Sequence, residues 1–268
     1  MKKVVIIIPI YKSEPNSLEK LSFIQCQKIL GHYPAVIIAP KGLDISFYKQ
    51  YFPSIKVKYF DSSYFISTLS YNRLMLSPNF YATWAAYEYM LIYQLDAYVF
   101  RDELEFWCQK KFDYIGSPVH NFILDNFSPE IEIATLNGGF SLRKISSFMK
   151  ILNSFHFIYS FKDLLKANTN QNLLLGPIKA LKYFLTGNNT YYRFNKYDRN
   201  EDYFWAFIAP KKNKSFKVAP ISESLQFGFD NKPEKSFELT NKKLPFGCHA
   251  IDKNFAFWKN YITIQNVE

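Results

Sequence analysis

The sequence predicts an α/β protein built on a mostly parallel sheet, and three observations support that class. Apolar runs rich in β-branched residues alternate with segments of helical spacing over residues 1–60. Strands buried on both faces of a parallel sheet have this continuous apolar character. The β-α-β-α-β order implies right-handed crossovers between parallel strands. The length of 268 residues suffices for one large α/β domain.

The first half of the chain supports this class element by element. The apolar run Lys3–Ile8 predicts a buried first strand that ends at Pro9. Leu18–Leu30 has apolar residues at roughly helical spacing, and Gly31 follows as a C-cap. In order, the next elements are predicted as a strand at Ala35–Ala39, a helix at Ile45–Phe52, a strand at Ile55–Phe60, helices at Phe65–Met75 and Phe80–Glu88, and a central strand at Tyr89–Leu95.

The second half alternates less regularly. Its elements are predicted as a short helix at Asp102–Cys108, a strand running into a turn at Tyr114–Pro118, apolar segments at Ile131–Leu136 and Phe140–Arg143 that enter and leave Asn137–Gly139, helices at Ser146–Leu152 and Tyr203–Ile208, and short strands at Phe216–Ala219 and Ser224–Phe229. Residues 155–197 show no clear sheet pattern and are interpreted as a helical or irregular insertion. We therefore expect a single domain over residues 1–268.

Composition and missing motifs disfavour several function classes. The net charge is +10, but the basic residues are spread out, with Lys211–Lys214 as the densest run. Without zinc-finger spacing or a basic helix carrying base-reading residues, nucleic acid is not an expected partner. No glycine-rich dinucleotide fingerprint or P-loop follows the first strand, which disfavours nicotinamide enzymes and P-loop kinases.

Cysteine usage and charge bear on location. Cys26, Cys108 and Cys248 are odd in number and far apart, which indicates reduced thiols and a cytoplasmic setting. The apolar run after Met1 is too short to span a bilayer. A basic surface attracts anionic lipid, so peripheral contact with the inner face of the membrane is also an expectation.

Four groups of residues are candidates for a functional role, and each also has a purely structural explanation. Asp96 follows a buried strand, where it holds a cation, caps a helix or pairs with an arginine. Asn137–Gly139 either brings the backbone close to a ligand or forms a tight turn. Glu201 and Asp202 suit a general base or the positive N-terminus of a helix. His249 is either a metal ligand or a hydrogen-bonded core residue.

The order of these motifs resembles the GT-A glycosyltransferases. The sequence contains Gln94-Leu95-Asp96, then Asn137-Gly138-Gly139-Phe140-Ser141-Leu142-Arg143, then Asn200-Glu201-Asp202, then Pro245-Phe246-Gly247-Cys248-His249-Ala250. It is most similar to an uncharacterised, mostly bacterial family of glycosyltransferases with the same motifs. The resemblance covers residues 1–150 and 198–255, and it implies a nucleotide-binding half at 1–100 and an acceptor-side half at 101–268.

The resemblance also implies roles for individual residues. Asp96 and His249 would hold Mn²⁺ or Mg²⁺, with Gln94 in place of the usual first aspartate, so that the donor phosphates complete the site. Asn137, Gly138 and Gly139 would lie beside the donor sugar. Asp202 would be the catalytic base, and Glu201 would orient the acceptor.

Further contacts with the donor are expected mainly from position. Pro9 and Tyr11, at the end of the first strand, would contact the nucleotide base, and Asp61 would lie near the ribose or the base edge. Asn72 and Arg73 would reach the diphosphate, because a guanidinium pairs well with phosphate oxygens. An exposed helical arginine is the simpler alternative.

The expected activity is therefore metal-dependent transfer of a sugar from a nucleotide sugar, with UDP favoured, to a glycan or lipid-linked glycan acceptor. By the same resemblance, transfer is inverting and serves bacterial surface polysaccharide synthesis. Two rivals remain open. One is an inactive carbohydrate-binding or assembly subunit, which Gln94 favours. The other is a sugar-nucleotide pyrophosphorylase, which the sequence Tyr11–Pro15 disfavours because it lacks a glycine-rich loop.

Overall fold

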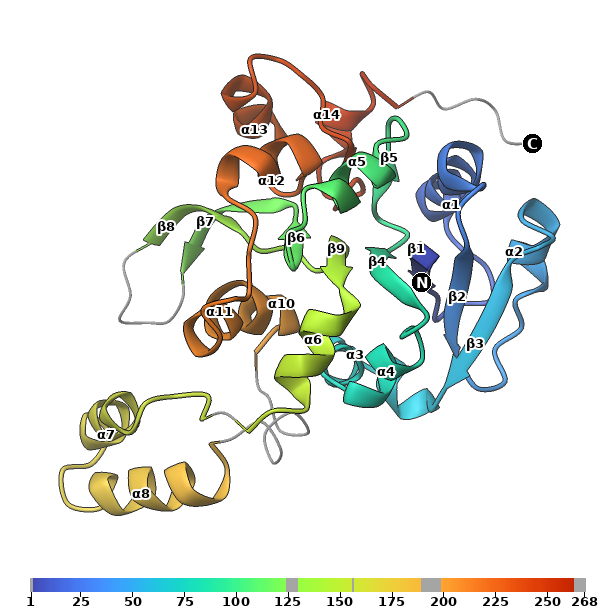
Figure 1. The fold of residues 1–268 in the computed structure, drawn as a ribbon. Helices are drawn as coiled ribbons and strands as arrows, with labels where there is room; N and C mark the ends of the chain where they lie inside the picture. The colour runs from blue at the N-terminus through green and yellow to red at the C-terminus, as the bar shows by residue number, and fades with distance from the viewer. Residues whose placement is uncertain (1, 124–129, 156, 189–198, 263–268) are drawn as a thin grey trace.

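The computed structural model describes residues 2–123, 130–155, 157–188 and 199–262. A six-stranded sheet in the order β3-β2-β1-β4-β9-β6 forms its centre (Figure 1). Its strands are β1 (Lys2–Pro9), β2 (Ala35–Pro40), β3 (Lys56–Phe60), β4 (Tyr87–Tyr93), β6 (Tyr114–Gly116) and β9 (Phe140–Lys144). The first four are parallel, and β9 runs antiparallel to both β4 and β6. The predicted α/β class and mostly parallel sheet are confirmed.

Helices cover both faces of this sheet because its central strands are apolar on both sides. In β1, Ile6 and Ile8 pack in one hydrophobic cluster, whereas Val5 and Ile7 pack in a second. The N-terminal helices and 3₁₀ turn are α1 (Ser17–Leu30), α2 (Ser46–Tyr51), η1 (Ser62–Phe65), α3 (Thr68–Met75), α4 (Pro78–Ala82) and α5 (Leu104–Gln109). Helix α1 begins at a capping box in which Asn16 and Glu19 satisfy each other's backbone N–H groups.

Smaller elements complete the second half. The remaining strands are β5 (Tyr98–Val99), β7 (Pro118–Ile123), β8 (Glu130–Thr135), β10 (Gly228–Phe229) and β11 (Gly247–Cys248). The remaining helices are α6 (Ile145–Leu152), α7 (Phe161–Thr169), α8 (Gly176–Thr186), α10 (Glu201–Tyr203), the π-helix η3 (Phe204–Ile208), α11 (Ala209–Lys212), α12 (Ile221–Phe227), α13 (Pro233–Leu239) and α14 (Phe255–Trp258).

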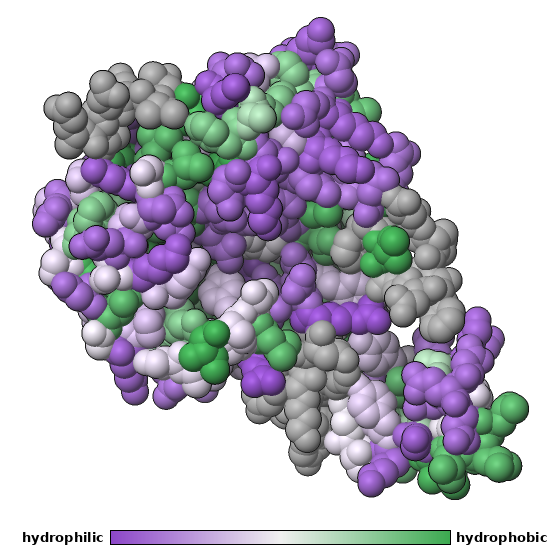
Figure 2. Space-filling model, turned by 180° about the vertical axis from the view of Figure 1, so that it is seen from behind, coloured by the Kyte–Doolittle hydropathy of each residue, from purple (hydrophilic) through white to green (hydrophobic). Residues whose placement is uncertain are grey.

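Helices α7 and α8 form a hairpin that projects from the body of the molecule (Figures 1 and 2). It occupies the segment predicted as a helical or irregular insertion, of which residues 156 and 189–198 lie outside the described residues. No helix in the described ranges is both long and apolar enough to cross a membrane.

The structure corrects several predicted elements. The predicted helix at Phe80–Glu88 ends at Ala82, because the chain must be extended from Tyr87, which pairs with Lys2 of β1. The strand predicted at Ser224–Phe229 is helical as far as Phe227. Phe216–Ala219 contributes only one bridge, between Val218 and Tyr114. The strand β7 was not predicted, and it exists by pairing with β8.

Candidate active site

A cavity of about 630 Å³ opens at the carboxyl ends of β1 and β4. Its lining includes Pro9 and Tyr11 beyond β1, Gln94 and Asp96 beyond β4, and Phe65 and Tyr71 from the segment between β3 and α4. In open α/β sheets, ligands bind in a crevice at the carboxyl edge. The crevice forms between two neighbouring parallel strands whose connections run to opposite sides of the sheet. The order β2-β1-β4 produces such a position. The predicted strand-end residues Pro9, Tyr11, Gln94 and Asp96 therefore share one cavity.

Asp96 and His249 meet although 152 residues separate them. His249 Nε2 lies 3.1 Å from Asp96 Oδ1 and 3.2 Å from Gln94 Oε1. The backbone brings them together, because Ile251 N donates to the Asp96 carbonyl and β11 pairs with β5. Burial opposes ionisation of Asp96, but His249 outweighs it and holds the carboxyl pKa below its usual value.

Asp230 is a functional candidate that the sequence interpretation missed. Its Oδ1 lies 2.9 Å from His249 Nδ1, on the opposite side of the ring from Asp96. Burial disfavours a charged imidazole, yet Asp96 and Asp230 together raise the pKa of His249 to about 10. A carboxylate behind a histidine fixes the ring orientation and leaves the far nitrogen facing the site. Asp230 directly follows β10, which has only two residues and so gives no long apolar run like the one that precedes Asp96.

The Asn137–Gly139 loop lies against the same histidine. Asn137 Oδ1 accepts hydrogen bonds from the N–H groups of Gly139 (2.8 Å) and Phe140 (3.0 Å), which fixes the turn. Its Nδ2 then faces His249 Nδ1 at 3.1 Å. A Cβ atom added at Gly139 would lie 2.2 Å from His249 Nε2, so only glycine allows this approach.

Arg143 joins this loop to α10 through a buried ion pair. Its guanidinium contacts both carboxylate oxygens of Glu201, at 2.7 and 3.0 Å, and donates to the Gly138 carbonyl at 3.1 Å. The Arg143 side chain is fully buried and that of Glu201 is 5% exposed. Because Arg143 occupies both of its oxygens, Glu201 is placed to hold the loop in position, and these contacts do not support the predicted role in orienting the acceptor.

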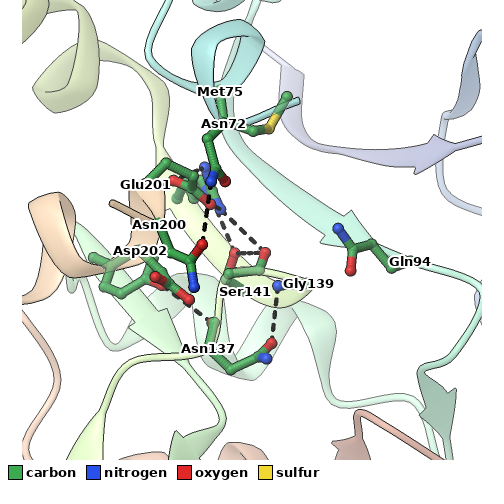
Figure 3. Close-up of polar contacts among 12 residues, drawn as sticks. Asn72, Met75, Gln94, Asn137, Gly139, Ser141, Asn200, Glu201 and Asp202 are labelled. Carbon is green, nitrogen blue, oxygen red and sulfur yellow. Dashed lines mark hydrogen bonds and ion pairs between the residues drawn. The ribbon is translucent and has the colours of Figure 1, made fainter. Parts of the chain in front are cut away.

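Asp202, which follows Glu201, is partly exposed, and the pKa of its carboxyl is shifted from the usual value. Burial and the neighbouring Glu201 carboxylate raise the pKa of Asp202 to about 7. A Cβ atom added at Gly138 would lie 3.3 Å from Asp202 Cβ and 2.3 Å from Glu201 Oε1, so α10 packs directly on the glycine loop (Figure 3). A carboxylate that titrates near neutral pH suits general acid–base chemistry.

The matching family is described as "Protein of unknown function (DUF5672)", and its model matches residues 54–249. The chain belongs to the DUF5672 family. No curated protein matches the sequence.

Solved structures similar to this DUF5672 chain include three glycosyltransferases. A glycosyltransferase involved in glycosylation of the major capsid of PBCV-1 has 8% identity and a TM-score of 0.46, covering 97% of this chain and 98% of the other. Mouse xyloside xylosyltransferase 1 has 9% identity, a TM-score of 0.48 and coverages of 92% and 97%. The galactosyltransferase LgtC with donor and acceptor sugar analogues has 10% identity, a TM-score of 0.45 and coverages of 98% for both chains. All three likenesses are distant.

Of the predicted donor contacts of the DUF5672 chain, the cavity lining lacks Asn137, Gly138, Gly139, Asp61, Asn72 and Arg73. The glycine loop still packs against Gln94, which lines the cavity. The other three residues have structural contacts. Asp61 caps the 3₁₀ turn η1, where its carboxylate accepts from Ser63. Asn72 is buried and donates to Asn200 Oδ1 at 3.2 Å. Arg73 is partly buried in α3, and its Nε has no hydrogen-bond partner. Their positions do not support direct contact with the donor.

The donor set nevertheless fits a hard divalent cation. The described residues contain no group of three or more His, Cys, Asp or Glu side chains arranged to hold a metal. His249 Nε2 lies 3.1 Å from Asp96 Oδ1 and 3.2 Å from the Gln94 amide oxygen, and Asp96 and Gln94 both line the cavity. The oxygen ligands of Asp96 and Gln94 suit Mn²⁺ and Mg²⁺. The Asp96 and Asp230 carboxylates, which raise the pKa of His249, also supply negative charge that attracts a cation.

Proposed function

We propose that this DUF5672 chain is a glycosyltransferase that moves a sugar from a nucleotide-sugar donor to an acceptor hydroxyl. The observation that carries the proposal is the contact of His249 with Asp96 and Gln94, which line a cavity on the carboxyl edge of the parallel sheet. The glycine loop packs against Gln94 and His249, and Asp202 packs against that loop. Such a cavity accommodates a nucleotide sugar, and the loop brings backbone close to it. Asp202 adds a base at neutral pH.

Each residue of the site would have a separate role in the reaction. Asp202 accepts the proton of the acceptor hydroxyl while that oxygen attacks the anomeric carbon and the nucleoside diphosphate departs. Asp230 orients His249, and Arg143 holds the loop and α10 in register. Asp96, His249 and Gln94 would hold Mn²⁺ or Mg²⁺, and a cation bound there would supply positive charge to the departing diphosphate.

The finer assignments of donor, stereochemistry and pathway are part of the same proposal. A single displacement assisted by one base inverts the anomeric centre, and NMR of the product determines whether it does. UDP is the favoured nucleotide, and a glycan or lipid-linked glycan in bacterial surface polysaccharide synthesis is the favoured acceptor. The proposed location is the cytoplasm at the inner face of the membrane, with no nucleic-acid partner.

A thermal-shift screen of UDP-, GDP- and CMP-sugars with and without Mn²⁺ tests the proposal. A ligand at 100 times its dissociation constant stabilises a protein by about 2.7 kcal/mol. We expect one nucleotide class to raise the melting temperature, and Mn²⁺ to strengthen that effect in the wild type but not in His249→Ala. If no sugar nucleotide stabilises the protein under either condition, the proposed donor site is wrong.

A further inference from the structure

The α7–α8 hairpin exposes an apolar surface that the proposed chemistry does not use. In α8, Ile178, Leu181 and Leu185 are 65%, 50% and 64% exposed. Their spacing of three and four residues places them on one face of the helix. The turn before α8 adds Leu173 and Leu174, which are 84% and 87% exposed. Figure 2 shows this apolar group at the tip of the projecting hairpin.

Positive charge borders the apolar face. Lys179 and Lys182 directly follow two of its residues on α8, and both are exposed. Residues 161–186 contain four lysines against one acid, Asp163. That acid accepts a hydrogen bond from Ser160 at the start of α7. An apolar helical stripe flanked by lysines is the pattern of a helix that lies in a membrane interface, because long lysine side chains reach the headgroups while the stripe enters the acyl region.

The geometry favours a lipid surface over a second copy of the chain. A two-fold contact places the same patch on both copies, so the lysines of one hairpin would meet those of the other. Helix α8 has 11 residues and spans about 16 Å, whereas a bilayer core is about 30 Å thick. The hairpin can therefore lie along a membrane but cannot cross it. We propose that the α7–α8 hairpin docks this protein onto an anionic lipid surface.

Co-sedimentation of the full chain with vesicles tests this proposal without donor, metal or turnover, so its outcome is independent of the proposed activity. The vesicles are phosphatidylcholine alone or with a quarter of phosphatidylserine. We expect binding to the anionic vesicles only, and weaker binding at high salt. Replacing Lys179 and Lys182 by Gln should weaken binding roughly 25-fold, since each lysine near the surface contributes about fivefold. The matched control is Lys56→Gln/Lys58→Gln on β3, at the other side of the molecule.

A second pair of variants tests the apolar face. Ile178→Ser/Leu185→Ser should lower partitioning by roughly tenfold or more, because both side chains leave water on docking. The control Ile123→Ser/Leu239→Ser alters residues of similar exposure on β7 and α13 and should bind like the wild type. Equal binding to both vesicle types, or unchanged binding of both hairpin variants, would overturn the proposal. A wild-type dimer that Ile178→Ser/Leu185→Ser converts to a monomer would instead assign the face to a second copy.

Discussion

Asp202 is partly exposed and its carboxyl has a raised pKa. Its proposed role as the base can therefore be tested through the pH dependence of the reaction. Burial and the Glu201 carboxylate raise its pKa to about 7, and only the ionised form accepts a proton. We therefore expect kcat/KM for sugar transfer to rise with pH up to about 7 and to fall tenfold per unit below it.

The same assignment predicts the effect of removing the carboxylate. Asp202→Asn should lower the transfer rate by ~10²–10⁴-fold, while the exposed Asp44→Asn leaves it unchanged. A pH profile that is flat between 5.5 and 8, or near-normal turnover in Asp202→Asn, would show that another group is the base.

Position 139 requires glycine because the side chains of His249 and Gln94 lie close to its backbone. A methyl group there would lie 2.2 Å from His249 Nε2 and 2.4 Å from Gln94 Oε1, so Gly139→Ala must displace the proposed metal ligands. We expect Mn²⁺ affinity in the presence of nucleotide to fall by roughly 10–100-fold, the range seen when a ligand loses its orientation. Isothermal titration calorimetry measures this. Gly187→Ala is the control, because its new methyl would lie 3.5 Å from the Tyr183 ring in ordinary contact.

At the scale of elements, the Arg143–Glu201 pair connects β9 to α10 inside the protein. Arg143→Met would leave the Glu201 carboxylate buried without its partner, which typically costs about 3–5 kcal/mol. Urea unfolding should show that loss, and Arg143→Met/Glu201→Leu should recover much of it because no buried charge remains. In the exposed pair Lys235–Glu132, Lys235→Met should cost no more than about 1 kcal/mol. Equal losses at both pairs would contradict a specific role for the buried one.

Elements were predictable where local pattern and tertiary structure agree. The strand β1 and helix α1 follow from an apolar run and a capped amphipathic segment. The pattern failed at α12, where an apolar segment that looks extended is helical. Its Ser224 hydroxyl reaches the Gly116 carbonyl and its Phe227 stacks against Phe140, neither of which is local in the sequence.

In the candidate site, too, residues were predictable where a local sequence pattern marks them and not where their role depends on tertiary contacts. Asp96 follows a long apolar run, which made it visible, and His249 became visible only through the order of the motifs. Asp230 follows a strand of two residues, too short to give a periodic signal. Its importance depends on contact with His249, which is set by the pairing of β10 with β11. Side chains that act through another residue therefore need the fold to be recognised.

At the scale of the whole molecule, the site joins residues from three hydrophobic clusters. The strands that end at the cavity pack in the two clusters on either face of the central sheet. Cys248, which precedes His249, belongs to a third cluster around Trp258. If the site is to keep its geometry, these clusters must fold together, as expected for a single domain.

The three free cysteines allow that cooperativity to be tested. Cys26 on α1 and Cys108 on α5 lie in the first cluster, Cys248 lies in the third, and each is at most 1% exposed. Burial raises the pKa of all three thiols, that of Cys108 to about 12. Since the thiolate is the reactive form, native protein should label slowly.

Pulse labelling across a urea titration, read by mass spectrometry, gives the outcome for each cysteine. In a single cooperative domain, Cys26 and Cys248 should become reactive at the same urea concentration, and that concentration should match the midpoint of the circular-dichroism transition. If the two halves unfolded independently, Cys248 would label at a different concentration from Cys26. The metal site would then depend on an interface between two domains, because His249 follows β11 whereas Asp96 follows β4.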